Sequence, residues 1–178
     1  MDKWNIAMEG KKQTGLTLVE LLIAVSIAAI LLGVGAPQLS GLMANARADN
    51  EIDTLYQDLI STRYLAMAYQ NNITVCPLDE KGSCVNQWQD GYTVFVDDGG
   101  DGVLGEDDEI LQQRSAIHPQ DALKVSHSQI RFSPDGFTMN TGTFIYCPLT
   151  ANSDNSRKLS IYRTGRVRYH DNGSHSCS

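Results

Sequence analysis

The chain has 178 residues, of which 42% are hydrophobic and 20% are charged, and its formal net charge is -7. These proportions are ordinary for a globular protein and exclude a mostly disordered, a collagen-like or a polytopic membrane chain. The length fits one domain with a single hydrophobic core.

The apolar residues are concentrated near the N-terminus, in residues 16–36, where Glu20 is the only ionisable side chain. As a helix this run would be about 32 Å long, enough to cross a hydrocarbon layer of roughly 30 Å. We therefore expect a transmembrane helix over residues 16–36. Lys11 and Lys12 precede it, and because positive charge stays on the cytoplasmic side, the rest of the chain should face outward. The run is too long for a cleavable secretory signal peptide.

Glu20 needs an explanation, because a charge inside an apolar span costs roughly 2.5 to 3.5 kcal/mol. A plain one-pass anchor offers none. The sequence Lys-Lys-Gln-Thr-Gly15 followed by Leu16-Thr-Leu-Val-Glu20, with Pro37 farther on, resembles the class III leader of type IV pilins and type II secretion pseudopilins. The family usually has Phe where this chain has Leu16.

This resemblance implies that residues 1–15 are a leader peptide. An inner-membrane prepilin peptidase would cut between Gly15 and Leu16 and methylate the new N-terminus at Leu16. Glu20 would then pair with the α-amino group of a neighbouring subunit during assembly, an attraction that is stronger in a low dielectric than in water. Two other interpretations of Glu20 stay open, a protonated and merely tolerated carboxyl and a proton relay, although a relay needs ionisable partners that the run lacks.

Pro37 predicts a kink or a loosening of the helix without ending it. An amphipathic helix is expected over residues 37–72, because small and apolar residues recur at steps of three and four. They are Ile52, Leu55, Leu59, Thr62, Ala66 and Tyr69. This stripe could form a coiled-coil seam, but we expect it to pack on a sheet, because strand-like sequence follows at once.

Residues 73–178 are expected to form a β-rich head made of antiparallel hairpins. Glycine, proline, asparagine and aspartate punctuate the runs of β-forming residues. The predicted strands are 73–76, 92–96, 110–113, 123–125, 130–132, 143–147, 158–162 and 166–169. The fold class is therefore α+β. One long N-terminal helix followed by such a head resembles the GspH/FimT family of minor pilins and pseudopilins.

All four cysteines follow the expected membrane span, on the side where disulfides can form. Of the three possible pairings we expect Cys76 with Cys84, which closes a short loop, and Cys147 with Cys177, which ties the C-terminus to a strand. A zinc site of four thiolates is the alternative, but the sequence has no Cys-x-x-Cys pair.

An acidic, glycine-rich loop over residues 97–109 could form a calcium-binding site. Asp97, Asp101 and Gly102 match part of an EF-hand-like loop pattern, but Gly99 stands at one ligand position and Asp108 stands where the pattern has Glu, so Asp97, Asp101 and Asp108 are the candidate ligands. The other interpretation is a long hairpin connection with carboxylates in water. We expect no cofactor and treat calcium as the weaker interpretation, because strands and not helices flank the loop.

Charge is distributed unevenly along the head. Residues 79–109 contain ten acids and one lysine, whereas residues 157–170 contain five cations and no acid. On a strand Arg166 and Arg168 point to the same face, where two guanidinium groups suit successive phosphates. Arg157, Lys158 and Arg163 would support them, and Tyr162, Tyr169 and His170 could add stacking. The alternative is a basic edge strand that resists aggregation.

Gly165-Arg166-Val167-Arg168 matches the Gly-Arg-x-Arg motif of FimT-type pilins, which implies DNA capture during natural transformation. We therefore expect a minor pilin, anchored in the inner membrane with its head in the periplasm and then assembled with other pilins into a type IV pilus. The alternative is a minor pseudopilin of a type II secretion system. A periplasmic enzyme is remote, because no Gly-x-Ser-x-Gly or His-Glu-x-x-His motif is present.

Overall fold

The structure is a computed structural model that describes residue 15, residues 17–149 and residues 154–178, without the side chains of residues 34–38. The chain divides into two compact units, Met1–Gly41 and Leu42–Ser178, and each unit is described by itself.

Helix α1 spans Leu18–Tyr69 as one unbroken element of 52 residues. Thr17 caps its start, because the Thr17 Oγ1 accepts a hydrogen bond of 3.3 Å from the backbone N–H of Glu20. Threonine followed three residues later by glutamate is a helix-start pattern. The helix continues through position 37, as expected, and the kink at Pro37 stays a prediction.

The expected membrane span was residues 16–36. Within the described part of the chain, no helical segment combines the length and the apolar character that crossing a membrane requires. Residue 16 and the side chains of residues 34–36 lie outside the described residues.

In the second unit α1 buries one stripe of side chains against the head. The stripe comprises Ala44, Ala48, Ile52, Leu55, Leu59, Thr62 and Ala66. It confirms the predicted periodicity except at Tyr69, which is 46% exposed. The helix ends at that residue and Gln70 adopts a φ of 53°, which starts the turn into the first strand, so Tyr69 lies at the exposed end of the stripe.

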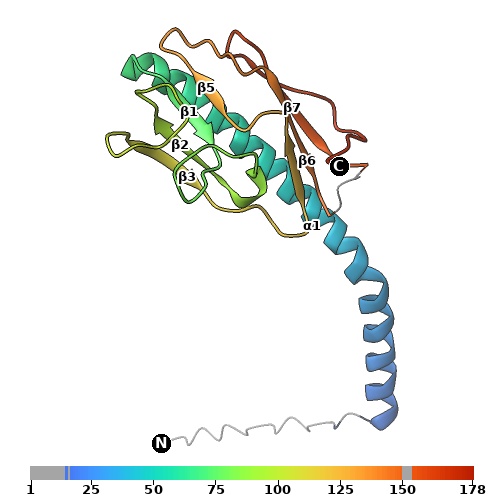
Figure 1. Cartoon of the computed structure of the whole chain (residues 1–178). Helices are drawn as coiled ribbons and strands as arrows, with labels where there is room; N and C mark the ends of the chain where they lie inside the picture. The colour runs from blue at the N-terminus through green and yellow to red at the C-terminus, as the bar shows by residue number, and fades with distance from the viewer. Residues whose placement is uncertain (1–14, 16, 150–153) are drawn as a thin grey trace, which may run out of the picture. The chain divides into compact units, whose positions relative to one another are not determined.

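Eight strands follow, all paired antiparallel as the sequence predicts. They are β1 (Ile73–Cys76), β2 (Tyr92–Val96), β3 (Ile110–Arg114), β4 (Ala122–Val125), β5 (Ile130–Phe132), β6 (Gly142–Cys147), β7 (Arg157–Ile161) and β8 (Val167–Tyr169). They form two four-stranded sheets with the orders β3-β2-β1-β5 and β4-β6-β7-β8. In Figure 1, β2 and β3 lie to one side of the C-terminal part of α1 and β6 and β7 to the other.

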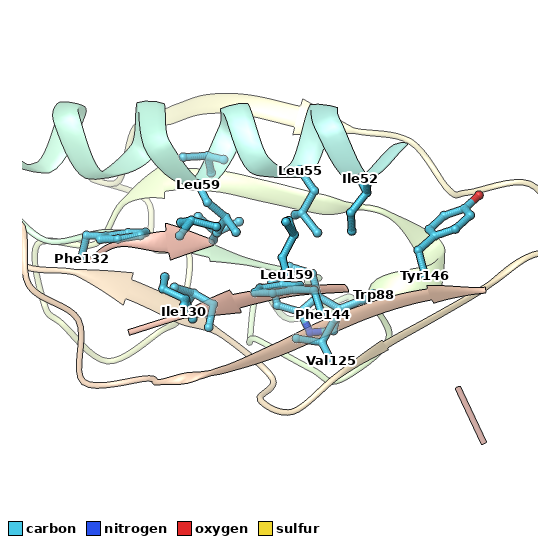
Figure 2. Close-up of a cluster of buried hydrophobic side chains, with 14 of the residues drawn as sticks. Ile52, Leu55, Leu59, Trp88, Val125, Ile130, Phe132, Phe144, Tyr146 and Leu159 are labelled. Atoms are coloured by element: carbon cyan, nitrogen blue, oxygen red, sulfur yellow. The ribbon is translucent and has the colours of Figure 1, made fainter. Parts of the chain in front are cut away.

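Both sheets and α1 share one hydrophobic core. Figure 2 shows Ile52, Leu55 and Leu59 extending from the helix toward side chains of the strands. Trp88, in the short 3-10 helix η1 (Trp88–Asp90), meets Phe144 edge-on with ring centroids 5.4 Å apart. The apolar stripe therefore packs on sheets, and a coiled-coil seam is not its role in this unit.

Among the residues that the structure describes, three ion pairs fix α1 to the head. Arg47 bonds Asp121, directly before β4, and Asp58 bonds Arg114 at the end of β3, with N to O distances of 3.1 and 2.8 Å. The third joins Asp49 to Arg157 of β7 at 2.5 Å. Polar residues of the helix therefore select which strand ends lie beside it.

Two disulfides join Cys76 to Cys84 and Cys147 to Cys177, the pairing that the sequence predicts, with Cα atoms 5.5 and 6.2 Å apart. No thiolate of these four is left for zinc. In the chain-entropy description a loop of 30 residues contributes more than one of 8, about 3.5 against about 2.5 kcal/mol.

Candidate nucleic-acid interface

The hairpin between β7 and β8 turns through Tyr162–Gly165. The Gly165 N–H donates to the Tyr162 carbonyl at 2.8 Å, and the Tyr162 N–H donates to the Arg166 carbonyl at 3.0 Å. Gly165 has a φ of 71°, and a Cβ at this position would collide with the Gly136 carbonyl and the Arg63 side chain. Both the backbone and the close neighbours therefore require glycine here.

Arg168 lies in β8 and Arg166 directly precedes it, and both side chains lie on the side away from the core. Val167 between them is buried, with 7% of its surface exposed, whereas both arginines are exposed. Residues two apart on a strand are about 6.7 Å apart. Neither guanidinium forms an ion pair or a hydrogen bond within the residues that the structure describes. The structure thus brings together the two residues that the motif singled out.

Arg157 occupies a different place from the one predicted. Its side chain faces α1, where Nε donates to Asp49 Oδ1 and Nη1 donates to the Asn155 carbonyl, both at 2.5 Å. The residue is 7% exposed. This corrects its expected position in the basic surface, because the strand alternation of β7 turns Arg157 inward.

Lys158 and Arg163 stay on the hairpin surface. Ser160 pairs with Arg168 across β7 and β8, so Lys158, two residues from Ser160, lies on the same face as Arg168. Lys158 is half-buried and Arg163 is exposed. Arg163 Nη2 lies 3.7 Å from the Met139 sulfur.

The aromatic residues of the hairpin are divided between its two faces. Tyr169 turns toward α1, where its ring centroid is 4.4 Å from that of Tyr56 and its hydroxyl donates to Asp53 at 2.7 Å. Burial first, and then the bond to Asp53, raise the pKa of Tyr169. Tyr162 is exposed, and His170 Nε2 lies 2.8 Å from the Ser160 hydroxyl.

The acidic loop connects β2 to β3, as the hairpin interpretation predicts. The Asp97 carboxylate is fully buried and accepts hydrogen bonds from the Thr74 hydroxyl, from Arg131 Nε and from the Gly102 N–H. Asp101 accepts the Val103 N–H, and Asp108 accepts the N–H of Asp98 and of Gly105.

These carboxylates therefore close turns and an internal ion pair. Within the described residues, no three His, Cys, Asp or Glu side chains are grouped so that they could hold a metal ion. Donors of the protein itself therefore bond Asp97, Asp101 and Asp108, and calcium stays the weaker interpretation of this loop.

Two protein families match this chain. Residues 10–36 match the prokaryotic N-terminal methylation motif, and residues 51–165, which are more than half of the chain, match the family described as type II transport protein GspH. The chain belongs to the GspH family. Comparison with curated proteins gave no significant match.

Two solved structures show what this GspH-family fold is similar to. One is the type IV minor pilin FimU of Pseudomonas aeruginosa, with a TM-score of 0.56, 20% identity, and coverage of 74% of this chain and 95% of that one. The other is the minor pseudopilin EpsH from the type 2 secretion system of Vibrio cholerae, with a TM-score of 0.52, 12% identity, and coverage of 70% and 96%. These likenesses confirm the pilin-like α+β fold.

Membership of the GspH family gives the chain a structural role. Minor pilins and pseudopilins assemble with other pilins. The methylation-motif match covers Gly15, Leu16 and Glu20. Gly15 is exposed, Glu20 lies in the first turn of α1, and Leu16 lies outside the described residues.

Proposed function

We propose that this GspH-family chain is a minor pilin of a type IV pilus and that the outer face of its β7–β8 hairpin binds DNA. The observation that carries the proposal is the pair of exposed guanidinium groups of Arg166 and Arg168, held side by side by a buried Val167. Such a pair suits successive phosphates, and Lys158 on the same face adds a third cation.

Exposed apolar side chains of the N-terminal unit are consistent with assembly in a membrane. Large apolar side chains of α1 are exposed around the helix, and such surfaces mark contacts with lipid or with other subunits. They belong to Leu18, Val19, Leu21, Leu22, Ile23, Val25, Ile27, Ile30, Leu31 and Leu32. We propose that the prepilin peptidase cuts between Gly15 and Leu16 and methylates Leu16, that residues 16–36 anchor the head outside the inner membrane, and that Glu20 pairs with a neighbouring N-terminus in the filament.

The DNA contact is tested by titrating labelled duplex DNA with the full chain in detergent. Arg166→Gln with Arg168→Gln should abolish binding, and each single variant should reduce the dependence of log K on log salt by about 0.9. Lys81→Gln removes the same charge from an exposed site on the acidic side of the head and should leave affinity unchanged. Unchanged binding by the double variant would rule out the hairpin as the DNA site.

A pseudopilin of a type II secretion system is the second candidate, because the matching family is described as a type II transport protein. Deletion of the gene distinguishes the two. Loss of transformation or twitching supports the pilus, whereas loss of protein secretion with normal twitching supports the pseudopilus.

A further inference from the structure

A groove runs between α1 and the free edge of β8. It has a volume of about 350 Å³, and its walls include Tyr56, Arg63 and Tyr64 of the helix and Gly165 to Tyr169 of the hairpin. β8 is the last strand of its sheet, so no further strand closes this side. The groove therefore adjoins the outer face of the β7–β8 hairpin, the proposed phosphate-binding face, along the edge of β8.

Positive charge gathers at one end of the groove. Arg63 is fixed there, because its Nε donates to the Gly136 carbonyl at 3.0 Å next to Gly165. Arg166 and Arg168 belong to the opposite wall, which the hairpin forms. Tyr169 of the hairpin wall donates its hydroxyl to Asp53, a carboxylate that does not itself line the groove. Ten residues of helix, about 15 Å, separate Asp53 from Arg63.

Tyrosine rings provide the apolar surface. Tyr56 and Tyr169 already contact each other, with centroids 4.4 Å apart. Tyr64 is different, because 63% of its surface is exposed although it lines the groove next to the cationic end. An exposed ring beside guanidinium groups is the combination on which single-stranded nucleic acids stack.

We propose that this groove binds single-stranded DNA, with an unpaired base stacked on Tyr64 and the adjoining phosphates held by Arg166 and Arg168. The inference rests on the proposed function and specifies the form of DNA that the site prefers. The groove volume lies at the lower end of the range for small-molecule pockets, about 300 to 1,000 Å³, so it admits a base and not a duplex. Paired bases cannot reach Tyr64, whereas phosphates of either form can reach the arginines.

The test compares a labelled thymidine oligonucleotide with the same strand in a duplex, using the full chain in detergent and fluorescence anisotropy. Tyr64→Ala should weaken binding of the single strand about tenfold and leave duplex binding unchanged. Tyr64→Phe keeps the ring and should bind as the parent chain does. Tyr69→Ala is the matched control, because Tyr69 is also an exposed tyrosine of α1 but does not line the groove.

The outcomes separate the two proposals. One outcome is that the chain binds duplex through Arg166 and Arg168 while Tyr64→Ala leaves the affinities for single strand and duplex unchanged, or lowers both equally. In that case the groove is not a single-strand site, and the proposed DNA function stands. If the parent chain binds neither form, the DNA function itself is wrong and the groove proposal fails with it. Selective loss of single-strand binding in Tyr64→Ala, retained in Tyr64→Phe, supports the groove.

Discussion

The arginines of the two sheets are used in different ways. In the first sheet Arg114 bonds the buried Asp58, and Arg131 bonds the buried Asp97. In the second sheet Arg157 bonds Asp49 of α1, whereas Arg168 of β8, and Arg166 directly before β8, face solvent. The same residue type therefore holds the structure together where a carboxylate lies opposite, and stays available to a ligand where the described residues place no carboxylate opposite.

The largest expected effect comes from removing a buried carboxylate of the first sheet. Asp97→Ala leaves the Thr74 hydroxyl, Arg131 and the backbone N–H of Gly102 without their acceptor. Loss of one partner of a buried pair costs about 3 to 5 kcal/mol. Urea unfolding of the full chain in detergent should show this loss. Asp101→Ala removes the same charge from an exposed site of the same loop and should cost far less; equal losses would contradict the comparison.

A smaller effect is expected in acid. Burial alone would raise the pKa of Asp58, but hydrogen bonds from Arg114, Tyr92 and Gln112 outweigh it and hold the pKa below its ordinary value of about 3.9. Hydrogen bonds from Arg47, Leu149 and Tyr146 likewise outweigh burial and lower the pKa of Asp121.

Because both folded-state pKa values are depressed, their contribution to stability is complete above the unfolded-state value and is lost as the pH falls through the folded-state values. The free energy of unfolding should therefore fall below about pH 4. Asp58→Asn removes one of the two groups, so the free energy of unfolding of this variant should fall less steeply with decreasing pH. If the free energy of unfolding of the variant depends on pH as steeply as that of the parent chain, the Asp58 network does not stabilise the fold in this way.

The smallest effect belongs to the exposed hairpin. Arg166→Gln and Arg168→Gln should each change the free energy of unfolding by less than about 0.5 kcal/mol, because both side chains are exposed and neither has a partner in the described part of the chain. Arg157→Gln in the same sheet should cost about 2 kcal/mol, since it loses charged hydrogen bonds to Asp49 and Asn155. Thermal unfolding of the three variants measures these differences. Equal losses of stability in all three would contradict the distinction between exposed arginines that bind a ligand and arginines that stabilise the fold.

Local patterns predict most of the secondary structure. The strands β1, β2 and β5 have the predicted bounds, β7 is shifted by one residue at both ends, and the others differ by one residue at one end, because alternation and turn residues act over a few positions. The division into two sheets is absent from such patterns, since it depends on which distant strands pair. The short helix at Trp88 was also not predicted.

The site was predicted in part for the same reason. Alternation on one strand suffices to place Arg166 and Arg168 together. The partner of Arg157 is 108 residues away, and the partner of Arg114 is 56 residues away, so neither pairing leaves a local signal. Asp58 illustrates the limit, because a carboxylate beside an apolar stripe is expected to be solvated unless its distant donors are known.

The attachment of α1 to the head has a mechanical consequence. Arg47, Asp49 and Asp58 tie the helix to strands of both sheets, and the outermost two are eleven residues, about 16 Å, apart along the axis. Tension along the helix is therefore transmitted to the sheets as shear that the three ion pairs resist together. If one ion pair breaks, the other two still resist the force.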